Sequence, residues 1–260
     1  MKRRTFVQAS VASLCTAATG TSLAADAKPK AGELYELRTY HLKADKQKML
    51  DEYLSKAFIP ALKRYGIGPV GVFVDQIAKD GVKIYVLIVH SSAEAVATLS
   101  VRLAADEEHL KAGADYLAAK AADPVYTRVE SSLLAAIEGL PKIEKTDASK
   151  PRLFNLRVYE SHNERAGKKK IEMFNKGEIA IFKRVGLTPV LFGESILGSV
   201  MPNLTYLLVF PDDDGRKAAW DKFRVDPEWL KIRAIPEYAD KEIVSRITNI
   251  LMTPTSYSEI

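Results

Sequence analysis

Cysteine is almost absent from this sequence. The single cysteine, Cys15, lies close to the start of a 260-residue chain. Because residues 1–27 are expected to be removed on export, the mature protein has no disulfide, no thiolate nucleophile and no cysteine metal ligand. Thiol catalysis and cysteine-based zinc sites are therefore excluded.

Charge of one sign is not concentrated either. The charged residues, 27% of the chain, are mixed along it and the net charge is only +5, so nothing indicates nucleic-acid binding. The densest basic run, residues 168–170, is predicted to start a helix in contact with solvent. Neither a P-loop nor a serine nucleophile elbow occurs.

The four histidines have no metal-ligand spacing, since no His-x-His or His-x-x-x-His pair occurs. We therefore predict no metal site and no required cofactor. Metal or haem ligation by His41, His90 or His162, each of which follows a predicted strand, is the alternative. His109 is predicted to pack in the core.

The first residues, MKRRTFVQ, resemble a twin-arginine export signal. They precede a mildly apolar stretch over residues 7–20, which is shorter than the roughly 20 residues that cross a bilayer. The small-x-small pattern at residues 25–27 predicts cleavage near residue 27. We expect a signal peptide over 1–27 and a periplasmic or extracellular protein without a stable membrane anchor.

The chain repeats itself at an offset of 119 to 121 residues. Residues 34–40 (LYELRTY) align with 153–159 (LFNLRVY), and 63–70 (KRYGIGPV) align with 183–190 (KRVGLTPV). Two further blocks keep this register: the aliphatic runs around Tyr85 and Tyr206, and residues 106–111 with 226–231. Four blocks in one register predict a tandem duplication.

Each repeat has the periodicities of a β-α-β-β-α-β unit. In the first repeat these predict strands over 34–41, 70–74, 82–89 and 129–136, with one helix over 45–65 and another after Ser92. In the second, Asp212–Asp214 and Asp226-Pro227 are typical helix starts. Such a unit is ferredoxin-like, an antiparallel sheet with both helices on one face.

The predicted organisation is a first unit over 33–138, a charged, proline-bounded linker over 139–151 and a second unit over 152–254. The fold class is α+β. Two ferredoxin-like units in one chain can cover each other's open faces and form an intrachain pseudo-dimeric α/β barrel with the helices outside. That barrel needs no second chain, and a homo-oligomer remains open.

These residues resemble the NIPSNAP family, a branch of the dimeric α/β-barrel superfamily. The resemblance rests on the opening strand YELRTY, on KRYGI with Val70, and on AAW followed by DPEW at 226–229. It extends over almost all of residues 33–252 in two copies. It implies the barrel architecture, and it carries over no catalytic residues.

The opening strands supply the candidate site. Because side chains alternate along a strand, one polar set shares a face in each repeat. We predict that these sets face the barrel interior while the apolar sets, beginning at Tyr35 and Phe154, pack under the helices. The candidate ligand-binding residues are Glu36, Arg38, Tyr40, Asn155, Arg157 and Tyr159.

Arg38 has two interpretations. In one, Glu36 or another carboxylate satisfies the guanidinium, which then only fixes how the sheets meet. In the other, Arg38 and Arg157 anchor a small polar or anionic ligand. Trp220 and Trp229 are predicted to pack in the core. The leading function is therefore an exported small-molecule-binding or scaffold protein, and the alternative is a monooxygenase-like or haem-handling enzyme.

Overall fold

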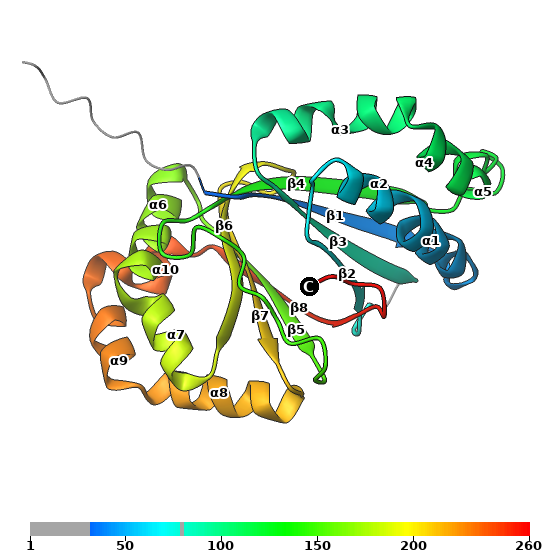
Figure 1. Ribbon diagram of the computed structural model, residues 1–260. Helices are drawn as coiled ribbons and strands as arrows, with labels where there is room; N and C mark the ends of the chain where they lie inside the picture. The colour runs from blue at the N-terminus through cyan, green and yellow to red at the C-terminus, as the bar shows by residue number, and fades with distance from the viewer. Residues whose placement is uncertain (1–31, 79–80) are drawn as a thin grey trace, which may run out of the picture. The chain divides into compact units, whose positions relative to one another are not determined.

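Eight strands form a closed antiparallel barrel in the computed structural model, which describes residues 32–78 and 81–260 (Figure 1). Their order around the barrel is β1-β3-β2-β8-β5-β7-β6-β4. The predicted signal peptide lies outside the described residues. The strands are β1 (Leu34–Leu42), β2 (Val70–Asp75), β3 (Val82–His90), β4 (Arg128–Ala136), β5 (Leu153–Glu160), β6 (Thr188–Leu197), β7 (Asn203–Phe210) and β8 (Arg246–Pro254).

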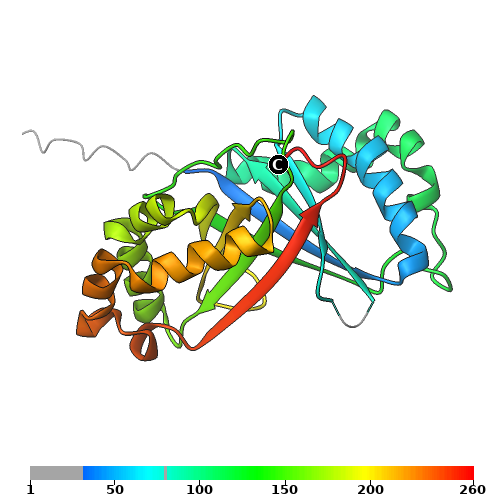
Figure 2. The ribbon, with the colours of Figure 1, turned by 90° about the horizontal axis from the view of Figure 1, so that it is seen from below.

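Helices lie outside the barrel in two groups, and Figure 2 shows β8 running between them. The first group is α1 (Gln47–Tyr53), α2 (Ile59–Arg64), α3 (Ala93–Ala105), α4 (Glu107–Ala112) and α5 (Ala114–Leu117). The second is α6 (Glu164–Met173), α7 (Ile179–Val185), α8 (Asp213–Val225), α9 (Pro227–Arg233) and α10 (Asp240–Ile243). Short 3-10 turns η1 (Ala44–Lys46) and η4 (Pro236–Tyr238) accompany them. None of the described helices is both long and apolar enough to span a membrane.

The predicted helix starts are confirmed. The Ser92 side chain accepts from the N–H of Ala95, and Asp212 accepts from Gly215 in the same way. Asp226 accepts from two N–H groups at the start of α9, where Pro227 occupies the first turn. A short polar side chain at these positions satisfies N–H groups that have no partner within the helix.

Both groups contain a π-helical turn at the same place. The predicted helix over 45–65 is interrupted by η2 (Leu54–Phe58), and its counterpart in the second group by η3 (Phe174–Glu178). The two turns are 120 residues apart, which is the offset of the sequence repeat. Single π-turns inside α-helices are rare and occur frequently at functional sites.

The two halves of the barrel have the same strand order. Residues 34–136 give β4-β1-β3-β2, and residues 153–254 give β8-β5-β7-β6. The halves are joined twice by antiparallel pairing, through β2 with β8 and through β4 with β6. The barrel is therefore closed within one chain.

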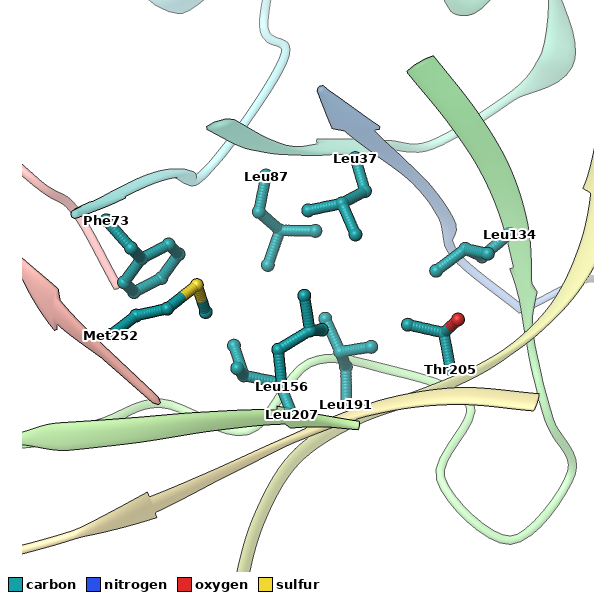
Figure 3. A pocket seen from close by; sticks show the side chains of 9 residues that line it. All are labelled: Leu37, Phe73, Leu87, Leu134, Leu156, Leu191, Thr205, Leu207 and Met252. Carbon is teal, nitrogen blue, oxygen red and sulfur yellow. The ribbon is translucent and has the colours of Figure 1, made fainter. Parts of the chain in front are cut away.

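The barrel interior is apolar, and the prediction of a polar interior is wrong. Side chains from opposite sides of the barrel point into one space, as Figure 3 shows. The cavity that they leave is about 10 Å³, room for no more than roughly one water molecule. Its lining is Leu37, Phe73, Leu87, Leu134, Leu156, Leu191, Thr205, Leu207 and Met252.

The polar residues of β1 and β5 lie on the opposite face, beneath the helices. The Arg38 guanidinium is 5.2 Å from the ring centre of Phe58 in η2, and that of Arg157 is 4.6 Å from the ring of Trp220 in α8. The predicted alternation is correct, but the polar face, which was predicted to point into the barrel, points towards the helices, and the apolar face points into the barrel. The reason is that a charged group in the filled lumen would lose water without gaining a partner.

We expect the packed lumen to be a main source of stability. Replacing Leu207, which is 2% exposed, with alanine should lower the free energy of unfolding by about 2–5 kcal/mol. Leu197→Ala is the matched control, because this leucine is 63% exposed and its loss should change stability by less than about 0.5 kcal/mol. Chemical denaturation measures both values, and equal losses would contradict a packed interior.

Candidate functional site

The predicted site residues lie in two layers between the sheet and the helices. On β1, Arg38 stands opposite Ser131 of β4, and on β5, Arg157 stands opposite Asn249 of β8. Ser131 and Asn249 are both exposed. Each arginine therefore lies at the edge of its helix group, on the side that solvent can reach. The structure brings Glu36, Arg38 and Tyr40 together in one layer and Asn155, Arg157 and Tyr159 in the other, and it separates the two sets.

In the first half the arginine is neutralised. Arg38 Nε donates to Glu36 Oε1 at 2.6 Å, and the Ser131 hydroxyl donates to the same oxygen at 3.2 Å. The second carboxylate oxygen of Glu36 lies 3.1 Å from Nε2 of the buried His90. Burial alone would raise the pKa of Glu36, but the hydrogen bonds from His90 and Arg38 outweigh it and lower the pKa to about 2. The interpretation in which Glu36 satisfies Arg38 is confirmed.

Tyrosine rings surround this ion pair. Tyr53 and Tyr116 stack with ring centres 3.8 Å apart, and Tyr40 meets Tyr126 edge to face at 5.7 Å. The Tyr53 hydroxyl lies 3.1 Å from Nε2 of His109, which is buried as predicted. Burial raises the pKa of Tyr53 and of Tyr116 well above the ordinary value, so both phenols stay neutral.

In the second half the arginine has no carboxylate partner. Arg157 donates from Nη1 to Asn249 Oδ1 at 3.1 Å and from Nη2 to the Tyr159 hydroxyl at 3.2 Å. Asn155 stands where the first half has Glu36, and no carboxylate of the described residues lies within 4.0 Å of Arg157. The Tyr159 hydroxyl also accepts from Tyr206, at 2.9 Å. The hydrogen-bond partners of the Arg157 guanidinium are thus neutral groups only.

Two buried N–H donors beside this arginine have no acceptor among the described residues. They are Arg157 Nε and Trp220 Nε1. A buried donor that finds no acceptor costs about 1–3 kcal/mol, so such groups are uncommon without a purpose. The prediction that Trp220 packs in the core is confirmed, but its free N–H was not foreseen.

A buried ion pair lies beneath the same layer. Lys170 and Glu178 are 1% and 2% exposed, with Nζ 3.4 Å from Oε2. The ammonium is also 5.0 Å from the ring centre of Phe174 and 5.2 Å from that of Tyr159. Burial raises the pKa of Glu178 to about 7, although the nearby charge of Lys170 acts in the opposite direction.

Sequence reasoning missed this pair. Residues 168–170 were predicted to contact solvent, which holds for Lys168 but is wrong for Lys170. The signal was present in the repeat. At an offset of 120, Lys170 falls on Leu50 and Glu178 on Phe58, two buried apolar positions.

The histidines and the glycines form no separate site. His41 lies 3.3 Å from Glu130, and His162 lines a groove of about 960 Å³ between α6 and α10. Within the described ranges, no group of three or more His, Cys, Asp or Glu side chains is placed to hold a metal ion.

Residues 66–71 have the glycine spacing of a dinucleotide loop, but they lead from α2 into β2 instead of from a strand into a helix.

The comparisons with known proteins agree with this architecture. The NIPSNAP family model matches residues 154–259. The second half of this chain is therefore similar to a NIPSNAP domain. No curated protein matches the sequence.

Three solved structures resemble both halves of this chain taken together. A candidate monooxygenase from Fusobacterium nucleatum has a TM-score of 0.57 and 11% identity, over 86% of this chain and 93% of that one. A candidate monooxygenase from Lactobacillus acidophilus has a TM-score of 0.56 and 12% identity, over 86% and 94%. An anthrone oxidase-like protein has a TM-score of 0.52 and 12% identity, over 88% of this chain and 92% of that one. At these identities the likeness establishes the fold alone.

The Glu36 cluster predicts acid sensitivity. Because the pKa of Glu36 is lowered from 4.5 to about 2, its contribution of about 3 kcal/mol is present above pH 4.5 and is lost as the pH falls towards 2. The stability difference between wild type and Glu36→Gln should therefore shrink over that range. Thermal denaturation as a function of pH measures it. Glu138→Gln, which changes an exposed carboxylate, should shift the melting temperature little at any pH.

The Lys170–Glu178 pair predicts opposite effects for single and double replacement. Lys170→Leu leaves a buried carboxylate without its partner and should cost about 3–5 kcal/mol. The double variant Lys170→Leu/Glu178→Phe copies the first half, and it should be as stable as wild type or up to about 4 kcal/mol more stable. Denaturant unfolding distinguishes the two, and a double variant weaker than the single one would refute the equivalence of these positions.

Proposed function

We propose that this protein is an exported small-molecule-binding protein of the NIPSNAP type that holds a small anionic ligand at Arg157. The observation that carries this proposal is a half-buried arginine without a carboxylate partner, whose own Nε and the neighbouring Trp220 Nε1 are buried and lack acceptors. An anion would supply both the missing charge and the missing acceptors. Arginine presents a planar fork of donors that suits carboxylate and phosphate groups.

The first half is proposed to act as a scaffold. An anion at Arg38 would have to compete with Glu36, which already occupies Nε at 2.6 Å and carries a full charge at neutral pH. That competition does not arise at Arg157, because its hydrogen-bond partners are the neutral side chains of Asn249 and Tyr159. The two halves thus share an architecture and differ in their capacity to bind.

The walls of the Arg157 layer favour a flat ligand. The guanidinium lies 4.6 Å from the ring centre of Trp220 and 5.4 Å from that of Tyr159. A ring attached to a carboxylate could lie against such aromatic faces while its oxygens accept from Arg157 and Trp220. An aromatic carboxylate is therefore the ligand class that we propose, with access along Asn249 on β8.

A tandem duplication and export from the cytoplasm are part of the same proposal. The register of the repeat over four sequence blocks and the common strand order support a tandem duplication that forms a pseudo-dimer. The paired arginines at the start of the chain support export by the twin-arginine route. A soluble ligand-binding protein in the periplasm is consistent with both.

A monooxygenase-like reaction is the second candidate, because two proteins with this fold are named as candidate monooxygenases. A haem-handling enzyme, which is the other form of this alternative, does not fit the surroundings of the histidines. His41, His90 and His109 each contact a carboxylate or a phenol, and the groove beside His162 is lined mainly by charged and polar groups. An axial ligand beside an apolar slot for a macrocycle is not offered there. Oxygen uptake with aromatic carboxylates or phenols, and an absorption spectrum of the purified protein, test this candidate.

Benzoate binding tests the proposed site. Wild type should bind benzoate in titration calorimetry, and Arg157→Met should weaken binding by at least about tenfold, because a charge-assisted hydrogen bond contributes roughly 1.5–3 kcal/mol. Trp220→Phe keeps the ring and removes only the free N–H, so it should weaken binding by a smaller factor of about 2–10. The matched control is Arg38→Met, which should lower stability and leave the affinity unchanged. Equal affinities of wild type and Arg157→Met would refute the proposal.

A further inference from the structure

The ligand-binding proposal leaves the Lys170–Glu178 pair without a role. Both side chains are almost completely buried between α6, η3 and the outer face of the sheet. The first half builds the same helix, π-turn and strand arrangement with Leu50 and Phe58 at these positions. This fold therefore does not require an ion pair there.

Burying two charges is costly, and well-packed apolar residues at the same positions are often as stabilising or more so. The contact itself is weak, because Nζ and Oε2 are 3.4 Å apart and Met173 Sδ is the other hydrogen-bond partner of the ammonium, at 3.5 Å. A pair that is neither required by the fold nor tightly bonded points to a role in the neighbouring Arg157 site.

The charges around Glu178 connect it to the Arg157 layer. The groups whose charges act on Glu178 are Lys170 of α6, Asp240 of α10 and Arg157 of β5, and Glu178 acts in turn on the phenol of Tyr206 in β7. Asp240 is mostly exposed and its Oδ1 is 4.0 Å from Lys170 Nζ. Tyr206 donates to Tyr159, and Tyr159 accepts from Arg157. Glu178 is thus connected to Arg157 through Lys170, whose ammonium is 3.4 Å from Glu178 and 5.2 Å from the ring of Tyr159.

We propose that Glu178 is the proton acceptor of the Arg157 site, so that binding of an aromatic carboxylate at Arg157 is accompanied by uptake of one proton at Glu178. This inference rests on the proposed function. With the site empty, the Glu178 carboxylate is paired with Lys170, and the charge of Arg157 also favours its ionised form. A second anion at Arg157 repels that carboxylate in a region shielded from water, and protonation of Glu178 removes the repulsion.

The electrostatics make such a proton uptake accessible near neutral pH. The pKa of Glu178 is raised to about 7 by burial, so its carboxylate is half protonated under ordinary conditions. A bound anion raises this pKa further. Binding should then strengthen by up to tenfold for each pH unit as the pH falls from about 9 to about 7, and it should level off below about pH 7, where Glu178 is already protonated in the empty site.

The test is the affinity for benzoate between about pH 6 and about pH 9, measured by titration calorimetry in two buffers of different ionisation enthalpy. Benzoate suits the purpose because its carboxyl group stays ionised throughout this range. The variant is Lys170→Leu/Glu178→Phe, which copies the first half and is expected to fold. Wild type should bind more tightly at about pH 7 than at about pH 9, with uptake of nearly one proton above about pH 8 and of less at lower pH, and the double variant should bind with little pH dependence and no proton uptake.

The outcomes separate the two proposals. Benzoate binding by wild type without pH dependence, or an equal pH dependence in the double variant, overturns the role of Glu178 and leaves the Arg157 site intact. Binding that is also unaffected by Arg157→Met overturns the proposed site and this inference together, as does a wild type that binds no benzoate at either pH. Glu194→Gln, a change in an exposed ion pair with Lys168, is a control that should retain the wild-type pH dependence.

Discussion

The barrel lumen determines where every charged side chain of the sheet can lie. Side chains of opposing strands meet there and leave about 10 Å³, and their surfaces are almost entirely aliphatic or aromatic. A guanidinium in that space would lose its hydration and find no counter-charge. The polar residues of β1 and β5 are therefore confined to the outer face, and the candidate site is a layer between sheet and helices rather than a channel through the barrel.

Within that layer the two halves have the same geometry and different charges. Glu36 brings a carboxylate to Arg38 and is itself bonded to His90, whereas the hydrogen-bond partners of Arg157 are an amide and a phenol. Next to Tyr159 the difference runs the other way: the second half has the charged pair Lys170 and Glu178 where the first half has apolar residues. The two halves thus offer two similar layers, one of which contains an arginine paired with a carboxylate and the other an arginine without one.

Local patterns in the sequence predicted most of the architecture. The offset near 120, the alternation in β1 and β5 and the caps at Asp212 and Asp226 each depend on a few neighbouring residues, and all of them reappear in the fold. Alternation, however, defines two faces without saying which one points inwards. In an ordinary two-layer sheet the apolar face meets the helices. Here both faces are buried, and the more tightly closed one takes the aliphatic set that includes Leu37 and Leu156.

The site residues that were missed depend on contacts between distant segments. Lys170 belongs to a run of three lysines that looks solvated, and only its alignment with Leu50 indicates burial. Trp220 could be predicted to pack from its apolar surroundings, but the absence of an acceptor for its N–H depends on what β5, β7 and α8 place around it. Such facts are properties of the closed structure and are not contained in any short window of sequence.

The aromatic packing of the second half explains how it can carry these unpaired groups. The rings of Phe174, Phe182, Phe192 and Tyr206 lie 5.1–6.1 Å apart, and Trp220 meets Phe182 edge to face at 5.8 Å. Close-packed rings of this kind have few alternative rotamers, so the positions of Arg157 and Trp220 are fixed when the chain folds. A ligand that binds there does not have to order the side chains that receive it, and less of its interaction energy is lost to conformational entropy. The dense core thus provides the stability that offsets the buried charges and also holds the donors in place for a ligand.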